Sequence, residues 1–104
     1  DRAANTFTSD GGIEELTVVS TAGSSATSTI LLVSPQLSTG NHYVYKGGAS
    51  AQTVTAGQDV TSWTVLSPGT AITLTGSPAI ITVVEADAAG KAVKVGSVTA
   101  VYGS

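Results

Sequence analysis

The chain lacks cysteine and methionine, and among its 104 residues it has only four cations, seven carboxylates, one histidine, one tryptophan and one phenylalanine. Without cysteine, neither a disulfide framework nor a thiolate metal site can form. The formal net charge of −3 comes from scattered charges. It argues against nucleic acid or an anionic membrane as a partner, because both require clustered Lys and Arg. No apolar run reaches the roughly 20 residues of a spanning helix, so we expect no membrane insertion.

Catalytic motifs are missing too. The single histidine, His42, has no nucleophile elbow beside it, and Glu14 and Glu15 point to opposite faces of a strand, so they cannot act together on one bond. Glu85 and Asp87 lack the spacing of a calcium loop, and we expect them to pair with lysines across a surface hairpin. The sequence therefore predicts a protein that is not an enzyme and that has no catalytic residue, cofactor or metal site.

Small and β-branched residues dominate what is present. Thr, Ser, Ala, Val and Gly supply 68 of the 104 positions, and the apolar residues come in short bursts between Gly, Pro, Asn and Ser. This pattern is typical of strands, and spacings of about ten residues indicate an all-β sandwich or a small barrel. We expect a positive φ at Gly90 in the loop 87–91 and a β-bulge at Gly96. The expected strands are 13–20, 26–34, 42–46, 51–55, 60–66, 70–75, 79–86 and 92–102.

The sequence divides into an N-terminal arm, residues 1–12, and a β-sandwich domain, residues 13–104. The arm has one large apolar residue, Phe7, and it ends in Gly11-Gly12, which resembles a hinge. Such an arm either lies across a neighbouring molecule, where it adds an edge strand, or frays as a tail.

Alternation within each expected strand predicts which residues form the core. The single tryptophan, Trp63, is expected in this core, as is common for a lone Trp in a small sandwich. The predicted core residues are Leu16, Val18, Leu31, Val33, Val44, Trp63, Val65, Ile72, Leu74, Ile81, Val83, Val93 and Val95.

Two expected strands, 26–34 and 79–86, are apolar on both faces, so either they are central strands or a neighbouring molecule covers their outer faces. Ile30, Leu32, Ile80 and Val84 have the opposite parity to the predicted core residues of their strands. In a two-layer monomer they would form a water-facing patch large enough to require a partner. The candidate assembly contact therefore consists of Phe7, Gly11, Gly12, Ile30, Leu32, Ile80 and Val84.

The aromatic residues offer an alternative. Tyr43, Tyr45 and Trp63 could stack on a sugar if their rings lay together on one exposed sheet face. This hypothesis makes the chain a carbohydrate-binding module, with these three residues as its ligand platform.

The segments LSTGNHYVYKGG, GQDVTSWTVLSPGTAIT and AIITVVEADAAGKAVKVGSVTAV together resemble a short Ig-like surface module of the kind found in bacterial surface-layer-type proteins and in virion head-decoration and fibre proteins. The resemblance covers roughly residues 16–101 and implies an all-β, Ig-like β-sandwich of seven or eight short antiparallel strands. It also implies scaffolding or display on an extracellular or virion surface, and it transfers no catalytic residue.

The two function hypotheses are therefore distinct. The first is a non-catalytic structural subunit of a capsid decoration, fibre, filament or surface layer, whose partners are copies of itself or a larger protein shell. The second is the carbohydrate-binding module, whose partner is a glycan. Burial of Trp63 and self-association favour the first, whereas an exposed Trp63 that responds to glycan favours the second.

Overall fold

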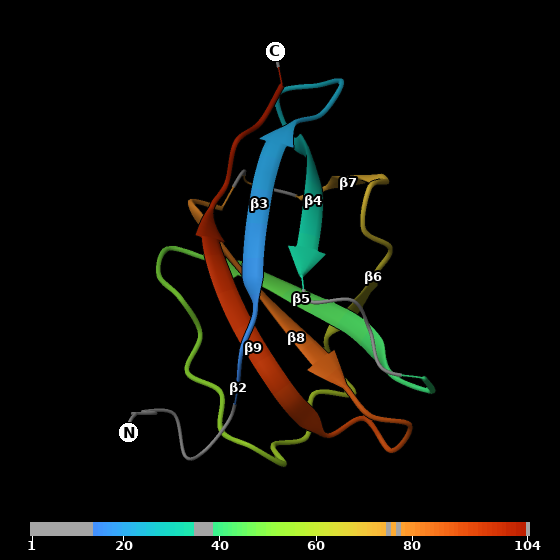
Figure 1. The fold of residues 1–104 in the computed structure, drawn as a ribbon. Helices are drawn as coiled ribbons and strands as arrows, with labels where there is room; N and C mark the ends of the chain where they lie inside the picture. Colours follow the sequence, from blue (N-terminus) through green and yellow to red (C-terminus); the bar gives the residue numbers. More distant parts are fainter. Residues whose placement is uncertain (1–13, 35–38, 75, 77, 104) are drawn as a thin grey trace.

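The computed structural model describes residues 14–34, 39–74, 76 and 78–103, and throughout this part of the chain the regular structure is β-strand, with no helix (Figure 1). The prediction of an all-β fold is confirmed. The arm, with Phe7, Gly11 and Gly12, lies outside the described residues. The strands are β2 Glu14–Glu15, β3 Thr17–Ala22, β4 Ser28–Ser34, β5 His42–Gly48, β6 Thr64–Leu66, β7 Ala71–Thr73, β8 Ile80–Ala86 and β9 Ala92–Thr99.

The strands form two sheets of unequal size. The larger has five strands in the order β2-β9-β8-β5-β6, and the smaller has three in the order β3-β4-β7. Neighbouring strands are antiparallel except for the two-residue β2, which runs parallel to β9. The chain changes sheet at Leu16, between β2 and β3, where the Leu16 N–H donates to the carbonyl of Val95 at 2.8 Å. Figure 1 shows β3 and β4 crossing in front of the larger sheet.

The inner core lies between the two sheets. Strands β3 and β4 contribute alternate residues to it, and β5, β6 and β8 supply the facing layer, as expected for a sandwich. Half-buried side chains such as Val33, Ile72 and Val98 complete its rim. The buried members are Leu16, Val18, Leu31, Tyr43, Leu66, Ile81 and Val83.

A second cluster covers the other face of the five-stranded sheet. The long connection from β5 to β6, residues 49–63, runs back over this face and places Val54 and Val60 against Val44 and Val84. Trp63, at the end of this connection, is half-buried against the same cluster. Strand β8, at the centre of the five-stranded sheet, is therefore buried on both faces from Ile81 to Ala86. The buried members are Val44, Val54, Val60, Val84, Ala86 and Ala92.

The prediction of a strand at 51–55 is wrong, because this segment has no regular structure, although its Val54 is buried. The segment lies over the face of a sheet and not at an edge, so it cannot join the backbone ladder. Its polar backbone groups find other partners. The Gln52 N–H donates to Thr82 Oγ1 at 2.9 Å, and the Gly57 N–H donates to the carbonyl of Ala92 at 2.8 Å.

The predicted bulge at Gly96 is also wrong in position. The register slips between Glu85 and Ala86 of β8, which pair with Lys94 and Ala92, so Val93 is the extra residue. Gly96 has a different role: a Cβ there would lie 2.3 Å from the carbonyl oxygen of Leu16. The expected positive φ at Gly90 is confirmed, with a value of 80°.

Most of the predicted core is where alternation places it. Leu16, Val18, Leu31, Val44, Ile81 and Val83 are buried, and Val33, Trp63, Ile72, Leu74, Val93 and Val95 are half-buried. The prediction that Val65 belongs to the core is wrong, because its side chain is 64% exposed on the edge strand β6. The prediction left out Val54 and Val60 and assigned Val84 to a contact between molecules, because it did not foresee that the 49–63 connection covers the second face of β8.

Candidate functional site

The outward face of the three-stranded sheet exposes large apolar side chains. Val19 of β3 and Leu32 of β4 are directly opposite each other in the register, and they are 48% and 50% exposed. Ile30, half-buried, pairs with the exposed Ala71 of β7 on the same face. We call the open part of this surface the bare face, and it consists of Thr17, Val19, Thr21, Ile30, Leu32, Ser34, Ala71 and Thr73. Ser28 has the same orientation by register but is buried.

Charge is distributed unevenly between the two sheets. No residue of β3, β4 or β7 is charged. All the ionisable Lys, Asp and Glu residues that the structure describes belong to the five-stranded sheet or to its connections. Desolvating an uncharged surface costs less free energy than desolvating a charged one, and the buried centres of protein interfaces are depleted in charged residues. The bare face therefore has the composition of a contact surface.

The predicted assembly contact is only partly assembled. Leu32 and Ile30 lie together on the bare face, whereas Ile80 is half-buried at the start of β8 in the other sheet. Val84 is wrong as a contact, because it is 0% exposed beneath the chain's own 49–63 connection. Sequence reasoning missed Val19 and Ala71; the absence of charge between Glu15 and Lys46 was the available signal.

Hydroxyl groups close the end of the sandwich beside the bare face. Ser20 Oγ and Thr29 Oγ1 lie 2.6 Å apart, and Thr29 Oγ1 also donates to the carbonyl of Thr21 at 2.9 Å. The Val101 N–H donates to Ser20 Oγ at 2.8 Å, which ties the C-terminal segment to β3. These buried or half-buried hydroxyls are thus satisfied within the fold.

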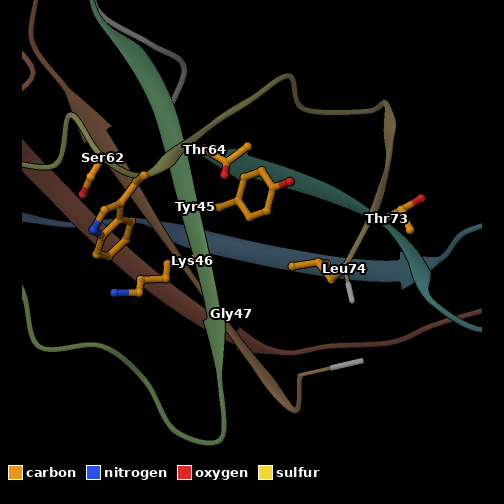
Figure 2. A pocket seen from close by; sticks show the side chains of 8 residues that line it. Tyr45, Lys46, Gly47, Ser62, Thr64, Thr73 and Leu74 are labelled. Carbon is orange, nitrogen blue, oxygen red and sulfur yellow. The ribbon is translucent and has the colours of Figure 1, made fainter. Parts of the chain in front are cut away.

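A pocket of about 290 Å³ lies at the open edge of β5. Strand β6 pairs with β5 only as far as Tyr45, so no described strand pairs with residues 46–48 on that side. Figure 2 shows Lys46 and Ser62 on one side of the β5 ribbon and Tyr45, Thr64 and Leu74 on the other. The Lys46 ammonium lies 5.9 Å from the centroid of the Trp63 ring, within the range of a cation–π contact. The pocket therefore wraps around the strand edge.

The predicted sugar platform does not form. Tyr43 is 3% exposed inside the inner core, so it is wrong as a ligand-stacking residue. Tyr45 packs against the inner core, while Trp63 packs against the second cluster, which lies on the opposite face of the five-stranded sheet. The two remaining rings both line the pocket, yet they do not share one surface.

A buried polar group sits beside Tyr43. Glu85, opposite Tyr43 in the register, is 0% exposed, its Oε2 accepts from Asn41 Nδ2 at 2.8 Å, and its Oε1 lies 3.8 Å from Lys94 Nζ. Burial, followed by the Glu85 carboxylate, raises the pKa of Tyr43 above its usual value. The Glu85–Lys94 pairing was expected, but as a surface contact; it is buried because both faces of β8 are covered.

The acidic loop residues have structural partners. Asp87 Oδ1 accepts from the N–H groups of Ala89 and Lys91 and so closes the β8–β9 turn. Asp59 Oδ1 accepts from the Thr61 hydroxyl at 2.7 Å and from the Thr61 N–H at 2.9 Å, and Asp59 Oδ2 lies 3.8 Å from Lys91 Nζ. These hydrogen bonds from Thr61, followed by the Lys91 charge, lower the pKa of Asp59.

Within the described ranges, no three His, Asp or Glu residues come together in a way that could hold a metal ion. The described residues also include no helix that is long and apolar enough to cross a membrane. His42 is half-buried at the start of β5, opposite Ala86. Comparisons with protein-family models, curated proteins and solved structures found no match to this chain.

Proposed function

We propose that this chain is a non-catalytic structural subunit of a multi-copy assembly on an extracellular or virion surface, and that it binds further copies of itself through the bare face. The observation that carries the proposal is a charge-free sheet with Val19 and Leu32 exposed side by side. The resemblance to Ig-like display modules supports the same class of function.

A second copy is the occupant that the composition favours. An uncharged face of Thr, Ser, Val and Leu repels no copy of itself, so two such faces can pack together as two sheets do in a sandwich. A charged partner surface would instead lose hydration there with no opposite charge to meet it, because no residue of β3, β4 or β7 is charged.

The size of the bare face indicates a weak contact. Strands β3, β4 and β7 have six, seven and three residues, and at a rise of about 3.4 Å and a strand spacing of about 4.8 Å they cover roughly 260 Å². A stable dimer buries roughly 800 Å² on each partner. One bare face therefore holds a neighbour weakly, as suits a subunit that is stabilised by repeated contacts in an array.

The carbohydrate-binding alternative is not proposed. Tyr43 lies in the core, and Tyr45 and Trp63 pack against opposite faces of the five-stranded sheet, so stacking on one sugar is available to a single ring at most.

Sedimentation of the intact chain over a range of concentrations tests the proposal. We expect the weight-average sedimentation coefficient to rise with concentration, and Leu32→Lys to suppress that rise by placing a charge in the contact. Val65→Lys is the matched control, because Val65 is exposed on the other sheet, and it should leave the rise unchanged. A chain that stays monomeric at every concentration, or equal effects of the two variants, would contradict the proposal.

A further inference from the structure

The open edge of β5 and its pocket are not used by the bare face, and they have the geometry of a strand-binding site. The backbone of residues 46–48 is paired with β8 on one side only. A strand laid along such an edge gains main-chain hydrogen bonds, and its alternate side chains point to the two faces of the sheet. The pocket has the matching shape, because it extends to both sides of β5 (Figure 2).

The two sides of the pocket differ in chemistry. One side presents the Lys46 ammonium beside the Trp63 ring, and the other presents Tyr45 and Leu74. No carboxylate lines the pocket, and Lys46 makes no ion pair with any residue in the described ranges, whereas Lys91 and Lys94 each face an acid. A lysine on an edge discourages neutral strands and favours an acidic one. The fitting segment thus has an acid on one face and an apolar side chain on the other.

The chain's own residues 1–12, DRAANTFTSDGG, have this pattern. Phe7 and Asp10 are three positions apart, so in an extended strand they point to opposite faces. In an antiparallel strand with Asp10 beside Lys46, Phe7 lies three residues further along the edge, on the face where Leu74 packs beside Gly47. We propose that residues 1–12 of a second copy add a strand to the β5 edge, an inference that rests on the proposed self-assembly.

The sheet topology favours a second copy over the same chain. Residues 1–12 precede β2, which lies at the opposite edge of the five-stranded sheet, three strand spacings or about 14 Å from β5. The centre of that sheet is covered on both faces, by the 49–63 connection and by the smaller sheet, so a segment of the same chain would have to pass around these covers. A segment that leaves from one edge and is accepted at the opposite edge joins copies head to tail. Such a heterologous contact repeats into a ring or a filament.

A charge exchange in the full-length chain tests the pairing. Asp10→Lys and Lys46→Asp each place like charges together, so each should weaken self-association roughly two- to tenfold in sedimentation equilibrium. The double variant restores opposite charges and should regain most of the loss. Phe7→Ala should weaken association more than tenfold, because it removes the aromatic anchor. Unchanged association in all variants, or a double variant no better than the singles, overturns the proposal.

Because the chain has no cysteine, a disulfide can report the contact directly. Copies with Asp10→Cys mixed with isotope-labelled copies with Lys46→Cys should form a mixed disulfide on oxidation, faster than a matched mixture of Asp10→Cys and Val65→Cys. If a chain with both Asp10→Cys and Lys46→Cys forms an intrachain disulfide when dilute, the second-copy occupant is wrong.

Fluorescence of the single tryptophan separates the remaining outcomes. Trp63 lines the pocket, so its emission should shift as the intact chain self-associates, and Lys46→Asp should reduce the shift. A soluble uronic-acid oligosaccharide that changes Trp63 emission without changing assembly makes the pocket a glycan site and overturns the strand proposal. If Leu32→Lys suppresses association while Asp10→Lys and Lys46→Asp leave it unchanged, this inference is refuted and the proposed function stands. If the chain does not associate at all, the proposed function is refuted as well.

Discussion

Strand β8, at the centre of the five-stranded sheet, and strand β4, at the centre of the three-stranded sheet, differ in what covers their second face. Both are apolar on both faces in the sequence. The 49–63 connection covers the second face of β8, so Val84 is buried, whereas Leu32 on the second face of β4 is 50% exposed. A doubly apolar strand therefore has two explanations, an intramolecular cover and a contact between molecules. The first holds for β8, and we propose the second for β4.

The largest expected difference is between two neighbouring leucines of β4. Leu31→Ala should lower the free energy of unfolding by about 2–5 kcal/mol, because Leu31 is 0% exposed in the inner core. Leu32→Ala should cost less than about 1 kcal/mol in a dilute monomer, since half of that side chain already meets water. Chemical denaturation at low concentration measures both. Equal costs would mean that the bare face is buried in the monomer.

Neighbouring valines of β8 should behave alike. Val83 and Val84 are both 0% exposed, on the inner and outer faces, so each truncation to Ala removes two buried methyl groups and should cost about 1.5–3 kcal/mol. The same denaturation experiment compares them. A Val84→Ala variant as stable as the parent would show that the 49–63 connection does not cover this face.

Gly96 tests how closely the chain packs where it changes sheet. A Cβ at this position would lie 2.3 Å from the Leu16 carbonyl oxygen, so Gly96→Ala should force the backbone apart and cost about 1–3 kcal/mol. Ser97→Ala, at the exposed next position, serves as the control and should change stability little. Thermal denaturation of the two variants side by side decides the point.

The smallest expected effect is the contribution of Asp59, in the 49–63 connection, to the pH dependence of stability. Asp59 has a lowered pKa in the folded chain, so its ionised form stabilises the fold above the unfolded pKa of about 3.9, and this contribution is lost as the pH falls through the lower folded pKa. We expect Asp59→Asn to remove a small part of the acid-induced loss of stability. Urea midpoints of the parent and the variant, measured from neutral pH into the acid range, check this. An equal fall of the midpoint with pH in the two proteins would contradict it.

Alternation in the sequence predicted the inner core well, because residues such as Leu31, Ile81 and Val83 follow the two-residue period of a strand. It failed for Val84, Val54 and Val60, whose burial depends on where a long connection folds back, and a local pattern does not encode that. The same reasoning placed Tyr43 on a surface, although the fold turns it toward the smaller sheet.

The candidate site was predictable in part. Leu32 and Ile30 were identified as surplus apolar residues, and they do share the bare face. Val19 was missed because it became a contact candidate only when the register placed it opposite Leu32. The pocket at Lys46 was missed because it depends on β6 beginning only at Thr64, which leaves part of β5 without a partner strand.

Hydroxyl-radical footprinting of the intact chain at low and high concentration is the sharpest test of the bare face as a contact, because three exposed large apolar side chains serve as internal reporters. Val19 and Leu32 lie on the bare face and Val65 lies on the five-stranded sheet, with exposures between 48% and 64%. We predict that Val19 and Leu32 lose reactivity as concentration rises while Val65 keeps its reactivity. Unchanged reactivity at Val19 and Leu32 under conditions where the chain associates would show that the bare face is not the contact.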